Sequence, residues 1–284
     1  MLNYNSAAAL RSFLEQEGLG MQKKFGQNFL INPQVRQALV TALDVQAGDE
    51  VWEIGPGLGV MTAMLLEKQL KVKAFEIDLG FIRILKRIFS QEENFTLVEG
   101  DVMKTWLAHS KPPAPYLLGN LPYNIAAALL ADFIEKGCFF SRMVVTVQKE
   151  VAQRMAAPAG SPDYSSFSVL CASAYNVKPL TVIRRESFYP QPNVDSMGVL
   201  LEKKDVSAYP AIFYPLLRAL FVSRRKTIKN NLLGFLSIKL GKFNAQELCT
   251  SILKENGINE KERAENLELS SFLSLAKSIN SMRI

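Results

Sequence analysis

The tetrapeptide Asn120-Leu121-Pro122-Tyr123 combines residue types that can hold an amino group on a planar ring. The asparagine side-chain oxygen and the carbonyl of the residue before proline can both accept hydrogen bonds from an –NH₂ group. Proline lacks an N–H group and restricts its own φ angle, which makes the turn rigid. Tyrosine then offers a ring on which a planar base can stack. Alone, such a tetrapeptide is more often an ordinary proline turn, so its meaning depends on the rest of the chain.

Residues upstream are arranged to bind an adenosine-containing ligand. The segment Glu53-Ile54-Gly55-Pro56-Gly57-Leu58-Gly59 follows a short apolar run, and its glycines allow a sharp turn close to a ligand. A dinucleotide-binding turn would have its third glycine at position 60, where this chain has Val60. Glu76 closes the second apolar run, where a carboxylate can bind a ribose diol, and Asp101 follows the third, where it can meet an adenine amine. Together they favour S-adenosylmethionine over NAD.

Each acid also has a simpler interpretation when taken alone. Glu76 would then be a solvated carboxylate at a strand end, and Asp101 would be the N-cap of a helix. The ordered spacing of the glycine turn and the two acids makes such a coincidence improbable.

These residues need a scaffold that brings several strand ends together. From Glu50 onward, short apolar runs alternate with amphipathic segments. This alternation predicts βαβ units and a mainly parallel sheet, in which ligands bind at the carboxyl ends of the strands. Strands are expected at 51–54, 72–77, 95–98, 116–118 and 143–147, with helices ending near 70 and spanning 81–89 and 125–134. Strand-like stretches at 178–183 and 197–201 are expected to form an antiparallel edge.

The C-terminal part of the chain has a helical pattern. Helices are expected at 213–222, 227–236, 245–256 and 269–279, with breaks at Gly241 and Gly257, and residues 157–161 are expected to form a surface loop. We place a domain boundary near Asp205, which divides the chain into residues 1–204 and 205–284. The first 20 or so residues carry no usable motif and are expected to form a peripheral helix.

Composition narrows the class of protein. The 284 residues are 48% hydrophobic and 21% charged, which is typical of a globular protein, and the net charge of +6 modestly favours a polyanionic partner. No apolar run approaches the ~20 residues needed to cross a bilayer, and the N-terminus lacks a signal-peptide pattern. We therefore expect a soluble, cytoplasmic protein that does not bind membranes.

The cysteines and the histidine exclude some kinds of site. Cys138, Cys171 and Cys249 are odd in number and far apart, so we expect buried hydrophobic side chains in a reducing compartment. His109 is the only histidine and lies in a polar Ser/Lys/Pro segment. We therefore expect neither a zinc site nor a Ser-His-Asp arrangement.

Taken together, these motifs resemble the ribosomal RNA adenine N6-dimethyltransferase family. Similarity to that family is carried by the glycine turn, Glu76, Asp101, the tetrapeptide, and the segments Lys24-Phe25-Gly26-Gln27-Asn28-Phe29-Leu30, Phe188-Tyr189-Pro190-Gln191-Pro192-Asn193-Val194-Asp195-Ser196 and Phe221-Val222-Ser223-Arg224-Arg225-Lys226-Thr227. The chain is most similar to the bacterial small-subunit enzymes that dimethylate two adjacent adenosines in a hairpin loop near the rRNA 3′ end. The resemblance extends from about Lys24 to Leu233. It implies a Rossmann-like, class I S-adenosylmethionine-dependent methyltransferase fold with a smaller, helical, rRNA-binding C-terminal domain, acting on the small ribosomal subunit or its precursor. Nothing in the sequence indicates an obligate oligomer, so we expect a monomer.

The resemblance also assigns roles to individual residues. It places Asn28 and Leu30 near the methionine end of S-adenosylmethionine, while the other cofactor-binding residues it implies are Gly55, Gly57, Glu76, Asp101 and Asn120. No metal is implied. Two departures are mild: Ala126-Ala127 stands where the family often has Ser or Thr, and Phe75 stands where a small aliphatic residue is usual. Neither removes a proposed ligand group.

The implied chemistry fits the tetrapeptide. The lone pair of adenine N6 is delocalised into the ring, and acceptors at Asn120 and Leu121 would favour a pyramidal nitrogen with a localised pair. Transfer from a sulfonium is then a direct in-line displacement that depends on positioning, and the base must be unstacked into the site. Tyr123 and Phe188 could stack on its two faces, although Phe188 could instead be a core residue. Pro122 completes the catalytic motif.

The basic segment has two readings. Arg224, Arg225, Lys226 and Lys229 cluster at a helix start and could contact phosphates, with Lys23 and Lys24 adding to the same surface. A run of charges is otherwise a solvated helix face. The resemblance favours RNA.

Three other functions compete with this one. A large-subunit rRNA dimethylase of the macrolide-resistance type more often has Ile at position 121, where this chain has Leu121. A non-catalytic ribosome-assembly or nucleic-acid-binding protein would not need an intact Asn120, Tyr123, Glu76 and Asp101. A DNA adenine methyltransferase fits the C-terminal segment less well.

Overall fold

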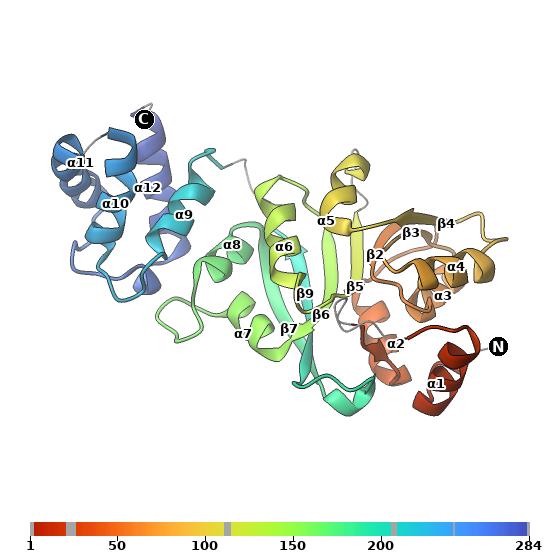
Figure 1. The fold of residues 1–284 in the computed structure, drawn as a ribbon. Coiled ribbons are helices and arrows are strands. Elements are labelled where there is room, and N and C mark those ends of the chain that lie inside the picture. Colours follow the sequence, from red (N-terminus) through yellow and green to blue (C-terminus); the bar gives the residue numbers. More distant parts are fainter. Residues whose placement is uncertain (1–2, 21–26, 111–114, 206–208, 241, 283–284) are drawn as a thin grey trace. The chain divides into compact units, whose positions relative to one another are not determined.

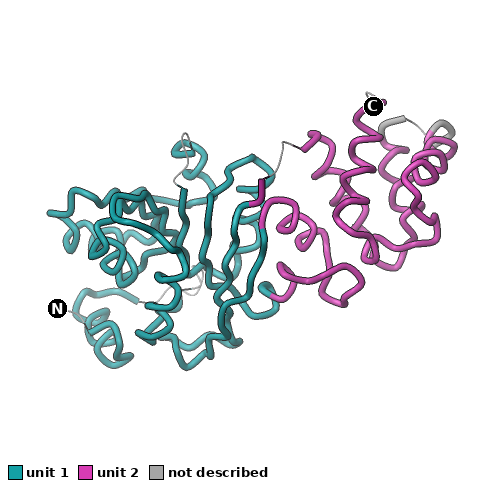
Figure 2. Tube along the Cα trace, turned by 180° about the vertical axis from the view of Figure 1, so that it is seen from behind, with its two compact units in different colours: residues 1–152, 176–203 teal, residues 153–175, 204–284 magenta. Residues whose placement is uncertain are grey.

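The computed structural model describes residues 3–20, 27–110, 115–205, 209–240 and 242–282. By contact density the chain divides into two compact units, drawn in different colours in Figure 2. Unit 1 comprises Met1–Ala152 and Asn176–Lys203, and unit 2 comprises Gln153–Tyr175 and Lys204–Ile284. The chain therefore changes unit next to the boundary expected near Asp205. Residues 153–175 differ from that expectation, because they belong to the second unit.

Unit 1 is built on a seven-stranded sheet of order β4-β3-β2-β5-β6-β9-β7 (Figure 1). The first five strands of this order are parallel to one another, and β9 is antiparallel to β6. The predicted parallel α/β sheet and its antiparallel edge are confirmed. The strands are β2 Glu50–Ile54, β3 Lys71–Glu76, β4 Phe95–Glu99, β5 Tyr116–Asn120, β6 Arg142–Gln148, β7 Tyr175–Ile183 and β9 Ser196–Lys203.

Alternate residues of a strand point to opposite faces of a sheet, and both faces of this one are covered by apolar packing. Val51 packs with Leu39 and Leu65 in one apolar cluster, which α2 and α3 help to form. Its neighbour Trp52 packs against Phe75 and Phe140 in an aromatic cluster. The helices of this unit are α1 Ala7–Gln16, α2 Pro33–Ala42, α3 Val60–Glu67, α4 Leu79–Ile88, α5 Val102–Thr105 and α6 Ala126–Glu135; α7 Lys149–Ala156 begins in unit 1 and ends in unit 2.

A second, two-stranded sheet joins distant parts of unit 1. Strand β1, Phe29–Leu30, pairs antiparallel with β8, Phe188–Tyr189, so that Leu30 lies opposite Phe188. A 3-10 helix, Arg185–Ser187, precedes β8, and the Ile31 N–H donates to the Ser187 carbonyl at 2.8 Å. Two of the motifs noted in the sequence are therefore neighbours in space.

Unit 2 is helical, as expected. Its helices are α8 Ser166–Ala174, α9 Phe213–Leu220, α10 Ile228–Leu240, α11 Lys242–Glu255 and α12 Leu269–Ser281, with a short 3-10 helix at Ala264–Asn266. The loop before α8 is bonded to the C-terminal helices: the Tyr164 hydroxyl donates to the Leu267 carbonyl at 2.9 Å, and the Gly160 N–H donates to the Glu265 carbonyl at 2.8 Å. These contacts explain why residues 153–175 belong to this unit.

Candidate active site

A cavity of about 300 Å³ lies in unit 1 where the strands β2, β3, β4 and β5 end. This position agrees with the expectation that ligands bind at the carboxyl ends of a parallel sheet. Of the residues predicted from the sequence as catalytic or cofactor-binding, all but Phe188 line the cavity. The lining ones are Asn28, Leu30, Gly55, Gly57, Glu76, Asp101, Asn120, Leu121, Pro122 and Tyr123.

The glycine turn between β2 and α3 needs its glycines. Gly55, Gly57 and Gly59 have φ angles of +70°, +59° and +80°, in a backbone region that residues other than glycine rarely adopt. A Cβ atom on Gly57 would also come within 2.9 Å of the Phe29 ring. Gly57 thus lets β1 approach the turn and close that side of the cavity.

Glu76 ends β3 and is almost fully buried, with 6% of its surface exposed. One carboxylate oxygen accepts hydrogen bonds from the N–H groups of Ile77 and Asp78, both at 2.8 Å, and the other accepts from Gly57 at 3.1 Å. Burial raises the pKa of Glu76 to about 7, although these backbone donors act to lower it. Glu76 is therefore tied to the glycine turn and is not a solvated strand end.

Asp101 is the N-cap of α5, and its Oδ1 accepts from the Met103 N–H at 3.0 Å. Among the described residues, no donor bonds its Oδ2. The same carboxylate can therefore cap the helix and accept a hydrogen bond from a ligand, so the two interpretations of this residue are compatible.

Asn120 ends β5 and contacts the N-terminal motif directly. Its side-chain amide donates to the Asn28 carbonyl at 2.7 Å, which orients the Oδ1 atom away from that carbonyl. The Leu121 N–H donates to the Thr146 carbonyl at 3.1 Å. In the part of the chain that the structure describes, neither Asn120 Oδ1 nor the Leu121 carbonyl receives a hydrogen bond. Both oxygens can therefore accept from an amine.

Tyr123 is held by a residue whose role the sequence did not reveal. Its hydroxyl lies 2.5 Å from the Ser196 Oγ, and Ser196 is fully buried. Burial raises the pKa of Tyr123, so its hydroxyl is neutral near pH 7. Ser196 ends the Val-Asp-Ser part of the signature at 188–196, and this contact gives that motif a physical purpose: it fixes the tyrosine ring.

Phe188 is placed differently from the stacking role considered for it. It is 1% exposed and packs in the core cluster with Leu30, Leu39 and Val40, and it does not line the cavity. Its position in β8, opposite Leu30, directs the ring into the core. The structure favours the core alternative for this residue. Phe29, Ile54 and Val102, which were not singled out, do line the cavity.

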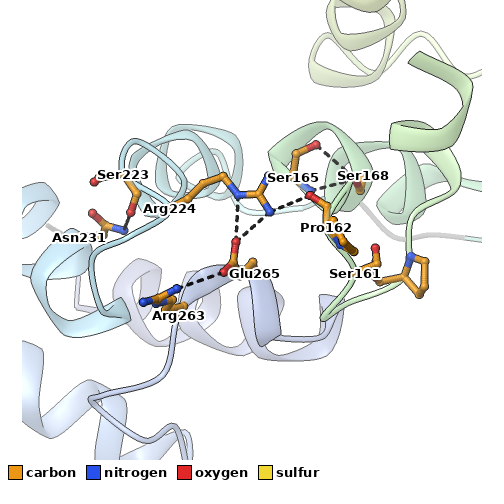
Figure 3. Close-up of polar contacts among 10 residues, drawn as sticks. Ser161, Pro162, Ser165, Ser168, Ser223, Arg224, Asn231, Arg263 and Glu265 are labelled. Carbon is orange, nitrogen blue, oxygen red and sulfur yellow. Dashed lines mark hydrogen bonds and ion pairs between the residues drawn. The ribbon is translucent and has the colours of Figure 1, made fainter. Parts of the chain in front are cut away.

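The four basic residues of unit 2 that were predicted to contact phosphates differ in their partners. The Arg224 guanidinium bonds the Glu265 carboxylate at 2.9 Å and the Pro162 carbonyl at 2.9 Å (Figure 3). The Lys229 ammonium bonds Glu260 at 2.6 Å.

By contrast, Arg225 and Lys226 are exposed, and neither side chain has a partner among the described residues. Within this segment they are the cations most available to an anionic partner. Lys23 and Lys24 lie outside the described residues.

Other expectations can be compared with the structure. Cys138, Cys171 and Cys249 are free and buried, as predicted. His109 ends a 3-10 helix instead of lying in a loop, and its ring meets the edge of Phe75 with 5.8 Å between centroids. The described ranges contain no group of three or more metal-binding side chains, and none of their helices is both long and apolar enough to span a membrane.

Comparisons with known proteins identify the family of the chain. The family described as Ribosomal RNA adenine dimethylase matches residues 18–281. Ribosomal RNA small subunit methyltransferase A of Treponema denticola is 47% identical over 284 residues, covering 96% of this chain and 94% of the relative. The protein of the same name from Borrelia garinii is 37% identical over 282 residues, covering 98% and 96%.

Solved structures show the same likeness. A dimethyladenosine transferase from Plasmodium falciparum has a TM-score of 0.77 at 29% identity, covering 89% of this chain and 98% of that one. The 23S rRNA methyltransferase ErmE has a TM-score of 0.64 at 19% identity, covering 88% and 99%, which indicates a similar fold and nothing further.

Proposed function

The chain belongs to the ribosomal RNA adenine dimethylase family, and from this premise we propose that it dimethylates N6 of two adjacent adenosines near the 3′ end of small-subunit rRNA. One observation carries the proposal: Asn120 and Leu121 line a cavity together with Glu76 and Asp101, and neither Asn120 Oδ1 nor the Leu121 carbonyl has a donor among the described residues. The relatives from Treponema denticola and Borrelia garinii, whose names specify the small subunit, support this choice of RNA.

The charge of the cavity suits S-adenosylmethionine as the methyl donor. Two carboxylates, Glu76 and Asp101, line it, and none of its described lining residues is Lys or Arg. Such a lining would not neutralise a pyrophosphate, whereas it would attract a cation. When bound, S-adenosylmethionine supplies a methyl group on a positively charged sulfur. Glu76 would accept hydrogen bonds from the ribose, Asp101 from the adenine amine, and Asn28, Leu30, Gly55 and Gly57 would complete the cofactor site.

The chain's own residues would prepare the target amine. Asn120 Oδ1 and the Leu121 carbonyl accept hydrogen bonds from N6, which favours a pyramidal nitrogen with a localised lone pair. Pro122 keeps that carbonyl oriented, because its ring restricts the turn. Tyr123, fixed by Ser196, provides a face for the unstacked base. Direct displacement requires no covalent intermediate on the protein, so a nucleophilic side chain is not needed.

The second unit would supply contacts to the rRNA backbone. Arg225 and Lys226 are exposed and can approach phosphates without first breaking an ion pair among the described residues. Arg224 would act indirectly, by joining the loop at Pro162 to Glu265. We propose that the protein works as a monomer in the cytoplasm, on the small ribosomal subunit or its precursor.

Methyl transfer to unmethylated small subunits tests this function. Purified protein is incubated with radiolabelled S-adenosylmethionine and subunits from a strain lacking the modification, and the product is located by primer extension. Paired dimethyladenosines near the rRNA 3′ end are expected. Asn120→Ala should bind subunits but transfer methyl groups at least a hundredfold more slowly, because the amine loses an acceptor. The exposed Asn94→Ala is the matched control and should behave as wild type.

Other outcomes would select another function. Methylation of large-subunit rRNA and not of small subunits would favour the macrolide-resistance type of enzyme. Binding to subunits without transfer to any RNA would favour a non-catalytic assembly protein. Wild-type turnover by Asn120→Ala would contradict the role given to that side chain.

A further inference from the structure

Arg36 is a buried arginine that has no acidic partner among the described residues. It lies on α2 with 5% of its surface exposed, and its described partners are the Leu30 carbonyl and the Asn5 side-chain oxygen. Its Nε atom is buried and has no hydrogen-bond partner in the part of the chain that the structure describes. Burying a guanidinium without a carboxylate is unfavourable, because neutral oxygens only partly replace its hydration. Burial accordingly lowers its pKa. Because this burial is unfavourable, the contacts that Arg36 makes should have a function.

Arg36 connects a cofactor-site strand to the N-terminal segment. One guanidinium nitrogen donates to the Leu30 carbonyl at 2.6 Å, in β1, and another donates to Asn5. The neighbouring Tyr4 hydroxyl donates to the Leu58 carbonyl at 3.1 Å, inside the glycine turn. Tyr4 is thus bonded to the glycine turn, and Asn5 is linked through Arg36 to β1, so that adjacent residues are joined to the two segments that form the walls of the cavity.

Apolar contacts reinforce these bonds. In α1, Leu10 and Leu14 lie one helical turn apart and are buried against Leu58, Phe81 and Ile84. The same cluster includes the partly buried rings of the cavity-lining Phe29 and of Tyr189 in β8. The segment therefore packs behind the glycine turn and β1 and is not merely peripheral.

We propose that residues 3–19 form a clasp that holds the two walls of the cofactor site together, and that Arg36 is the positioning residue that fastens the clasp to Leu30. This inference rests on the proposed function. The clasp touches neither the target amine nor its acceptors at Asn120 and Leu121. It should therefore affect how tightly the cofactor is held and how fast it leaves, and leave the rate of transfer at saturation nearly unchanged.

Variants at the fastening points test the clasp. Arg36→Met keeps the apolar stem and removes both hydrogen bonds, and Tyr4→Phe removes only the bond to Leu58. Binding of S-adenosylhomocysteine is measured by calorimetry, kcat and cofactor KM by steady-state kinetics, and folding by thermal melting. We expect Kd and KM to rise at least tenfold in Arg36→Met and about threefold in Tyr4→Phe, with kcat within threefold of wild type. The control is Arg83→Met, an exposed arginine on α4, which should change neither constant.

The double variant adds a second criterion. Because Tyr4 and Arg36 fasten the same segment, Tyr4→Phe combined with Arg36→Met should be little worse than Arg36→Met alone. If Arg36→Met does not fold, Tyr4→Phe and Asn5→Ala decide the question. Unchanged Kd in folded variants, or a fall in kcat at constant KM, would overturn the clasp. Failure of the wild type itself to bind S-adenosylhomocysteine would instead overturn the proposed function.

Discussion

Cofactor affinity is expected to depend on pH through Glu76. Burial raises the pKa of this carboxyl from its ordinary 4.5 to about 7. A ribose diol donates hydrogen bonds and therefore needs the ionised carboxylate as acceptor. Below pH 7, binding of the cofactor must also remove the proton from Glu76, and this requirement weakens the binding. Affinity should thus be full above pH 7 and decline as the pH falls.

The size of this effect follows from linkage. With a pKa of about 7 in the free protein and an ionised Glu76 in the complex, Kd should be about 30-fold higher at pH 5.5 than at pH 8.5. With an unperturbed carboxyl near 4.3, the same ratio would be only about 1.1. Glu76→Gln should bind more weakly at high pH by roughly 10- to 100-fold, because hydrogen bonds to a charged group contribute about 1.5–3 kcal/mol each.

Calorimetric titration with S-adenosylhomocysteine from pH 5.5 to 8.5 separates these cases. Wild type should show the pH dependence, and Glu76→Gln should not, since its amide does not titrate. His109→Gln removes the only histidine, next to the cavity-lining Phe75, and should retain the dependence. A wild-type ratio below threefold would refute the reasoning, as would loss of the dependence in His109→Gln.

Three further predictions concern the tyrosine proposed to hold the target base, the basic segment and a buried carboxyl. Tyr123→Phe loses the contact with Ser196 and should lower kcat about tenfold at nearly constant cofactor KM in steady-state kinetics, a loss of about 1.4 kcal/mol; an unchanged kcat would show that the ring needs no fixing. Arg225→Ala should reduce the slope of log rRNA affinity against log salt by about one, whereas Arg224→Ala should mainly lower the melting temperature; equal salt slopes would contradict this division. Glu53 is fully buried, and burial raises its pKa to about 7. Its protonated form therefore stabilises the folded protein, fully below pH 4.5, and this stabilisation is lost as the pH rises through 7. The loss in the free energy of unfolding is at most about 3 kcal/mol. In urea unfolding, the free energy of unfolding should therefore fall less between pH 5 and pH 8 for Glu53→Gln than for wild type. Equal falls would argue against this role of Glu53.

The residues predicted to bind a cofactor all line the cavity, because the information that places them there is local. The glycines at 55 and 57 adopt φ angles that few other residues tolerate, and their spacing is visible in the chain. Glu76 ends one strand and Asp101 follows the next, and the carboxyl ends of parallel strands meet at one edge of the sheet. Periodicity likewise predicted α9, α10, α11 and α12 of the second unit, but not α8.

Tertiary packing decided what depends on pairs of residues far apart in the chain. Phe188 and Tyr123 are both aromatic and both belong to recognisable motifs, yet one ring lies in the core and the other lines the cavity. Arg224 and Arg225 are adjacent and chemically identical, but only Arg224 meets an acid among the described residues.

The N-terminal segment is the clearest case of this kind. It carries no motif, and its relation to the site rests on Arg36 and on apolar packing. The sequence by itself determined which groups this protein has for the chemistry, because spacing and backbone preference are local properties. Only the tertiary structure decided which of them are free to act, because hydrogen-bond partners and burial arise from contacts that no single segment contains.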